Sequence, residues 1–149
     1  MRPLIASPLV AVAIFACTEP LSPSAYIGSY PLRTVNGSAV PAAAPAAQAG
    51  CTVAFGPGAL GLGDGVFTLA FSSGYGCPGV NATAYSVTVG GSLSGRSSPL
   101  TARAIDPMGQ AESTMEMSLS IAGSDAILTA PAGVMGLGAA TTLVFGPKQ

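Results

Sequence analysis

Three cysteines, Cys17, Cys51 and Cys77, are the residues of this 149-residue chain whose side chains could do the most chemistry. A thiol can be acylated, can join a second thiol in a disulfide, can ligate a metal or can act as a nucleophile. The chain contains no histidine, so it lacks both the commonest zinc ligand and the usual base for a serine or cysteine nucleophile. The three thiols therefore favour lipid attachment and disulfide formation over catalysis or metal binding.

The segment before Cys17 has the features of an export signal. Residues 4–16 are apolar apart from Ser7 and Pro8, and they follow one positive charge at Arg2. This stretch is too short to span a bilayer. Its end, Ile14-Phe15-Ala16-Cys17, resembles the lipobox of bacterial lipoproteins, in which the cysteine is acylated and becomes the first residue of the mature protein. The resemblance implies a signal peptide over residues 1–16, a lipid on Cys17 and a membrane as partner.

Plain secretion is the alternative to lipidation. Ala11-Val12-Ala13 is an acceptable site for ordinary cleavage, and Ile14 and Phe15 depart from the usual lipobox residues. Cleavage there would leave Cys17 as an odd thiol in an oxidising compartment. We therefore expect an exported protein that is lipid-anchored in the bacterial envelope. The outer membrane is favoured because Thr18 stands where an aspartate retains some lipoproteins at the inner membrane.

Two cysteines, Cys51 and Cys77, remain once Cys17 is assigned to lipid attachment. In an exported chain these two are expected to form a disulfide. Closing the loop between them would stabilise the fold by about 3–4 kcal/mol in the chain-entropy model.

Composition points to one β domain over residues 26–149. Only 7% of residues are charged, and 20 Gly and 13 Pro are typical of a turn-rich chain. The formal net charge of −1 leaves no basic patch for nucleic acid. Residues 17–25 are expected to form the lipidated cysteine and a flexible tether that does not pack. Residues 39–50 are expected to be an extended loop because Pro41 and Pro45 interrupt an alanine-rich helix pattern.

Alternation with a period of two predicts strands with one buried face. In residues 115–121, Met115, Met117, Leu119 and Ile121 point one way and polar residues point the other. The same pattern predicts strands near 26–35, 52–55, 59–63, 66–72, 84–89, 100–105, 113–121, 126–130 and 141–145.

Turn chemistry predicts how these strands pair. Two-residue turns at 64–65 and 123–124 give in-register apolar faces, with Leu62 opposite Phe67 and Leu119 opposite Leu128. At Gly90-Gly91 a two-residue turn gives the wrong face, so a three-residue loop through Ser92 is predicted, pairing Val89 with Leu93. Asp106 to Gly109 is a turn signal.

An antiparallel meander of about eight to ten short strands favours a small up-and-down β-barrel, which hides its edges. A β-sandwich is the alternative. Residues 26–37, Gly76-Cys77 with the strand at 85–87, and the closing strand at 141–145 resemble META-domain lipoproteins. Pro78 stands where that family has asparagine, and its later cysteine segment is missing. The resemblance implies a compact envelope-facing barrel with no established catalytic activity and no site residues to transfer.

Other polar residues offer no catalytic, metal or cofactor site. Lys148, the sole lysine, lies next to the C-terminus, so a Ser-Lys dyad is disfavoured. Asp64 falls in a turn and Glu116 on a solvent face. Asp106 and Glu112 could join Glu116 in a calcium site, but the spacing favours solvated surface. The three scattered arginines are also expected at the surface, at Arg33, Arg96 and Arg103.

Methionines 115, 117 and 135 leave two interpretations open, because they could line a pocket for an apolar ligand or pack the core. The favoured function is a non-enzymatic cell-envelope lipoprotein with a structural or stress-protective role. The alternative is a lipocalin-like binding module for a small apolar ligand, which requires an internal cavity of about 300 Å³ or more.

Overall fold

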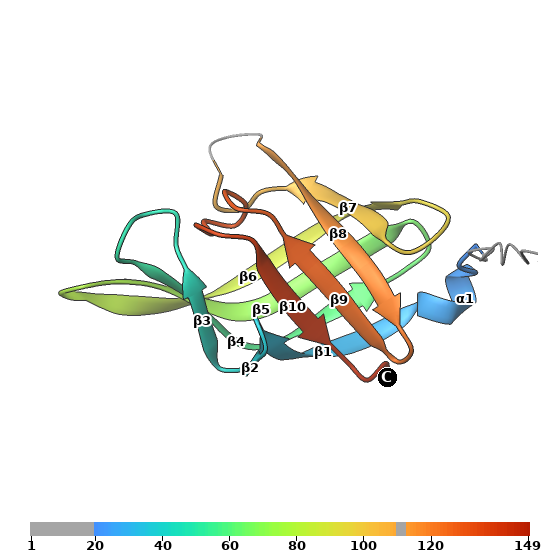
Figure 1. Ribbon diagram of the computed structural model, residues 1–149, viewed down its shortest axis with the longest axis horizontal. Helices are drawn as coiled ribbons and strands as arrows, with labels where there is room; N and C mark the ends of the chain where they lie inside the picture. The colour runs from blue at the N-terminus through green and yellow to red at the C-terminus, as the bar shows by residue number, and fades with distance from the viewer. Residues whose placement is uncertain (1–19, 110–112) are drawn as a thin grey trace, which may run out of the picture.

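Ten strands form one antiparallel sheet that closes on itself (Figure 1). The computed structural model describes residues 20–109 and 113–149. A short helix, α1, spans Pro23–Tyr26. The strands are β1 Gly28–Val35, β2 Ser38–Ala39, β3 Ala42–Pro45, β4 Thr52–Leu62, β5 Val66–Cys77, β6 Val80–Ser94, β7 Leu100–Ile105, β8 Thr114–Ala122, β9 Asp125–Ala130 and β10 Thr141–Phe145.

Eight of these strands make the barrel. Strands β4 to β10 pair in chain order, and β1 closes the circle by pairing with both β10 and β4. β2 and β3 add to the rim beside β1 and β4. This confirms the predicted all-β up-and-down barrel over the alternative sandwich. Residues 39–50 are not only a loop, because β3 pairs in register with the first part of β4.

β1 and β4 each change partner along their length. The first part of β1 pairs with the second part of β4, from Gly28 opposite Leu62 to Pro31 opposite Ala59. The register of β4 shifts between Phe55 and Gly58, a bulge that bends the strand and redirects its edge. The two strands predicted at 52–55 and 59–63 are therefore one bent strand.

The β5–β6 hairpin extends beyond the rest of the barrel (Figure 1). Its strands are longer than predicted, and the predicted loop at Gly90-Gly91 is wrong. Gly91 lies within β6, between Phe67 of β5 and Ala104 of β7. A Cβ on Gly91 would collide with the Arg103 carbonyl and the Phe67 ring, so this glycine serves close packing and not a turn.

The two other predicted hairpin registers are confirmed. Leu62 lies opposite Phe67 across the turn at 64–65, and Leu119 lies opposite Leu128 across the turn at 123–124. The 115–121 pattern also holds, since Met115, Met117 and Leu119 are buried between exposed neighbours, although Ile121 is only half-buried. Apolar residues of alternate positions thus point into the barrel and fill it.

The segment before β1 packs against the barrel, which corrects the expectation of a free tether through residue 25. Leu21 donates its N–H to the Arg96 carbonyl at 2.9 Å, and Leu21 packs against the core. The buried Tyr30 hydroxyl donates to the Tyr26 carbonyl at 2.7 Å. The apolar side chains at 21 and 26 explain this docking. The expected signal peptide 1–16 and Cys17 lie outside the described residues.

Candidate functional site

The barrel has two unlike ends. One end, here called the α1 end, carries α1, the turns at 63–65, 95–99 and 123–124, and the C-terminus. The opposite end, here called the disulfide end, carries the loops at 46–51 and 131–140, the turn at 106–109 and the tip of the β5–β6 hairpin.

Cys51 and Cys77 are bonded to each other at the disulfide end, as predicted. The bond joins the start of β4 to the end of β5, where the hairpin projects past the barrel. Backbone bonds hold the adjoining loop, since Ala46 donates to the Cys51 carbonyl at 3.0 Å and Cys51 donates to the Gln48 carbonyl at 3.1 Å. The bond therefore ties the tip of the projecting hairpin to the start of β4.

The segment from Pro131 to Ala140 closes the mouth of the barrel at this end. Met135 and Leu137 are almost completely buried, and Leu137 forms an isolated bridge with Ala46. The chain is fixed on both sides, because Ala47 donates to the Gly136 carbonyl at 2.8 Å and Gly138 donates to the Pro45 carbonyl at 2.9 Å. We call residues 131–138 the plug.

Asp106 anchors the plug, which corrects its assignment to solvated surface. The residue is 8% exposed, and its carboxylate accepts the Met108 N–H at 2.9 Å and the Met135 N–H at 3.0 Å. The predicted turn is present, with Gly109 donating to the Asp106 carbonyl at 3.3 Å. Burial of a carboxylate is offset here by two backbone donors. Sequence reasoning missed this because the partner lies 29 residues away.

The interior is filled by side chains. Met115, Met117 and Met135 are at most 2% exposed and belong to one hydrophobic core. Large completely buried residues surround them, namely Tyr30, Phe55, Phe67, Phe145, Leu60, Leu69, Leu119, Leu128, Leu137 and Leu143. Phe55 stacks on Phe71 with ring centroids 5.2 Å apart. Of the two interpretations of the methionines, the structure supports core packing.

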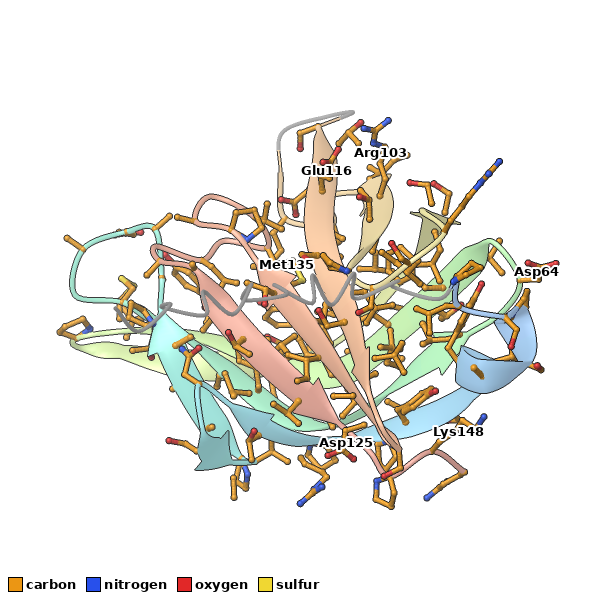
Figure 2. All side chains as sticks on the ribbon, turned by 45° about the vertical axis from the view of Figure 1, so that its right-hand side comes forward. Asp64, Arg103, Glu116, Asp125, Met135 and Lys148 are labelled. Carbon is orange, nitrogen blue, oxygen red and sulfur yellow. A yellow bond between two sulfur atoms is a disulfide. The ribbon has the colours of Figure 1, made fainter. Side chains whose placement is uncertain are left out.

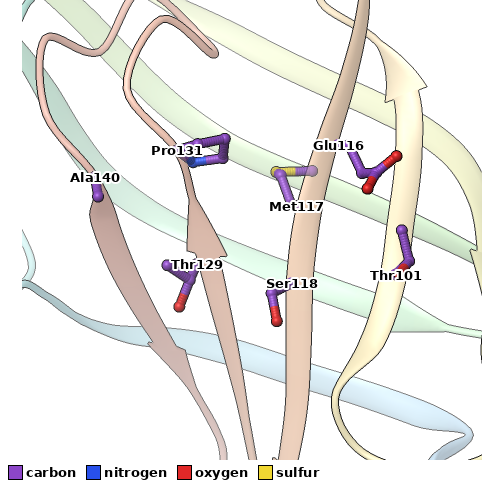
Figure 3. Close-up of a pocket in the computed structure, with 7 residues that line it drawn as sticks. All are labelled: Thr101, Glu116, Met117, Ser118, Thr129, Pro131 and Ala140. Atoms are coloured by element: carbon purple, nitrogen blue, oxygen red, sulfur yellow. The ribbon is translucent and has the colours of Figure 1, made fainter.

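The hollows described lie on the outer wall. The one in Figure 3, about 330 Å³, is lined by outward residues of β7, β8 and β9, by Pro131 and Ala140, and at its floor by the buried Met117. It lies where β9 ends at Ala130 and the chain turns away from β8. Two further shallow hollows cover the outer face of β4, β5 and β6, whose outward residues are small and uncharged.

Charged residues form ion pairs on the outer surface of the barrel. Arg103 donates to Glu116 at 2.6 Å, and Arg33 lies 3.5 Å from Asp125. Arg103 and Glu116 lie together on β7 and β8, whereas Asp64 and Lys148 lie toward α1 (Figure 2). Arg33, Arg96 and Arg103 are exposed, as predicted. Within residues 20–109 and 113–149, no three His, Cys, Asp or Glu side chains gather closely enough to hold a metal ion. Glu112 lies outside that part of the chain.

Comparison with known proteins yields no relative, since no protein-family model, no curated protein and no solved structure matches this chain. Among the described residues, no helix is long and apolar enough to cross a membrane.

Proposed function

We propose that this protein is a lipid-anchored lipoprotein of the bacterial envelope, with the lipid on Cys17, and that its barrel is a non-enzymatic structural module. The observation that carries this proposal is the docking of residues 20–27 at the α1 end, directly after the lipobox-like segment. A chain that leaves a folded body so close to an acylated cysteine would hold that body against the membrane.

The expected orientation follows from the length of free chain. Residues 17–20 span at most about 10 Å when fully extended, so the α1 end would face the lipid headgroups. Two exposed apolar side chains at this end, Ile27 and Val66, suit contact with the membrane interface. The disulfide end, with the plug and the projecting hairpin, would then point away from the membrane.

The Cys51–Cys77 bond supports export, because disulfides persist in oxidising compartments. The packed interior weighs against the lipocalin-like alternative, which requires an internal cavity. Large buried side chains occupy the space that a ligand would need. A structural or stress-protective role is the function that an anchored, stiff and filled barrel supports best.

Intact mass measurement of the protein extracted from its native membrane tests the proposal. We expect a mass equal to residues 17–149 plus acyl chains, with two thiols appearing only after reduction. The Cys17→Ser variant is the control and should lose the acyl mass and the membrane association. A mass that begins at Ile14 without lipid would contradict anchoring and favour plain secretion.

A further inference from the structure

The outer edge of β6 has no partner strand over much of its length. β6 pairs with β5 along nearly its whole length, from Val80 to Ser92. On its other side it pairs with β7 only through residues 91–94. On the side away from β5, no described residue forms a backbone hydrogen bond with residues 82–88. Figure 1 shows β6 continuing past the end of β7 toward the tip of the hairpin.

The register identifies which backbone groups face this open edge. Leu93 donates its N–H to the Gly65 carbonyl at 2.8 Å, and hydrogen-bonded positions recur at every second residue of an antiparallel pair. Odd-numbered residues of β6 therefore bond to β5. The even-numbered residues direct their N–H and C=O groups outward, at Ala82, Ala84, Ser86 and Thr88.

This edge lacks the features that keep edge strands single. Natural sheets protect their edges with charged residues and proline, yet residues 80–94 contain neither. Three of the exposed large apolar side chains flank the edge: Val80 is 66%, Ile105 68% and Met108 38% exposed. The half-buried Tyr85 lies at the middle of the free segment, with its hydroxyl 3.6 Å from the Met108 sulfur.

We propose that two copies of this protein associate by antiparallel pairing of their β6 edges around a two-fold axis at Tyr85. In this register Ala82 lies opposite Thr88 of the second copy, and Ala84 lies opposite Ser86. All the outward groups of residues 82–88 are then satisfied, by about eight backbone hydrogen bonds. A second copy fits this edge because an uncharged strand meets its own copy without like-charge repulsion.

Side chains support the same register. Tyr85 lies opposite Tyr85 of the second copy in a close, non-hydrogen-bonded pair, where aromatic side chains stabilise a sheet. Val80 comes level with Gly90 of the second copy. Ile105 lies one position beyond the Gly91–Ala104 pair, where β7 leaves the edge, so the paired segment is limited to residues 82–88 and the exposed apolar side chains of the two copies approach each other at its ends.

The pairing fixes the relative orientation of the two barrels. A two-fold axis perpendicular to the joined sheet makes the strands antiparallel, so the two α1 ends lie at opposite ends of the assembly. Copies that both carried a lipid anchor would join two membrane surfaces. The inference itself does not depend on lipidation.

Cysteine trapping in the full exported protein tests the register. Under mild oxidation, Tyr85→Cys is expected to give at least about tenfold more covalent dimer than Thr88→Cys, because disulfides need Cβ atoms about 4 Å apart. The two copies of residue 88 are six positions apart along the strands, about 20 Å. Equal trapping of the two variants would indicate random collision and overturn the proposal.

Sedimentation of the variants without added cysteines provides the second test. The unsubstituted protein is expected to be dimeric at micromolar concentration. Ala84→Lys should be monomeric while keeping the β-sheet circular dichroism of the folded barrel, because it places lysines of both copies on one short edge. Thr68→Lys, an exposed position on β5 away from the edge, is the matched control and should stay dimeric.

Three results would overturn self-pairing. The first is an unsubstituted protein that remains monomeric at millimolar concentration. The second is a dimer that Ala84→Lys leaves intact, because another surface would then hold it. The third is a monomer that holds an extended segment of a different protein on residues 82–88.

Discussion

Asp106 and Met135 are joined across 29 residues of sequence by a 3.0 Å hydrogen bond from the Met135 N–H to the Asp106 carboxylate. The same carboxylate accepts the Met108 N–H. One side chain thus holds its own turn and also holds the plug against the barrel. Met135 has φ of 52°, a conformation that costs a non-glycine residue energy, so the contacts of the plug must offset that cost.

The first prediction concerns this anchor. Asp106→Asn replaces one acceptor oxygen with a donor that faces a backbone N–H, and we expect a loss of about 1–3 kcal/mol in the free energy of unfolding. Hydrogen exchange at the Met135 amide should accelerate more than exchange in β8. Asp64→Asn, in an exposed turn, is the control and should change stability by less than about 0.5 kcal/mol. Unaltered exchange at Met135 would show that the carboxylate does not hold the plug.

Adjacent glycines of β6 give a second prediction. Gly91→Ala should destabilise the protein by about 1–3 kcal/mol, because the added methyl meets the Arg103 carbonyl and the Phe67 ring. Gly90→Ala points outward, where the nearest atom to the new Cβ is the Phe67 carbonyl oxygen at 3.9 Å. That substitution should be neutral or stabilising by about 0.5 kcal/mol. Urea unfolding of both variants measures the difference, and equal effects would contradict the packing argument.

The disulfide supplies a third prediction. Replacing both Cys51 and Cys77 with alanine removes a cross-link between residues 26 positions apart, which should cost about 3 kcal/mol of unfolding free energy. The effect on local dynamics should concentrate at the tip of the hairpin and the start of β4, near Gly76 and Thr52. Hydrogen exchange measures this. A uniform increase across β8 to β10 would instead indicate that the bond stabilises the whole barrel equally.

Alkaline pH provides a fourth prediction. Burial raises the pKa of the Tyr30 phenol above its ordinary value of 10.0, so the folded state holds the phenolic proton more tightly than the unfolded chain does. Stability from this group is fully present below about pH 10 and is lost as pH rises through the higher folded pKa.

Tyr30→Phe tests the origin of that loss. The variant should be less stable at pH 8 by about 1 kcal/mol, because the bond to the Tyr26 carbonyl is gone. Its stability should then fall less steeply than that of the unsubstituted protein between pH 9 and about pH 11. Thermal unfolding across this range is the measurement. Parallel pH curves for the two proteins would assign the alkaline loss to other groups.

Local sequence patterns predicted much of the barrel. Alternation along residues 115–121 and the registers at 64–65 and 123–124 were sufficient for the hairpins, because each depends on near neighbours and on a side-chain period of two. The expectation of export and the two thiols other than Cys17 predicted the Cys51–Cys77 bond.

The failures share one physical cause. Gly91 looks like a turn residue in sequence, but its role depends on Phe67 and on the carbonyl of Arg103. Asp106 looks like a surface carboxylate, but Met135 arrives from another part of the chain. Leu21 looks like part of a tether, but it packs against the hydrophobic core, and Tyr26, expected to begin a strand, ends α1 instead.

The sequence by itself determined the strand class, the local hairpins and the pairing of the cysteines, since these follow from periodicity, turn chemistry and parity. Only the tertiary structure decided where β1 and β4 change partners, how the plug fills the mouth and that β6 keeps an open edge. Those features depend on contacts between residues far apart in the chain, which no local pattern of side chains encodes.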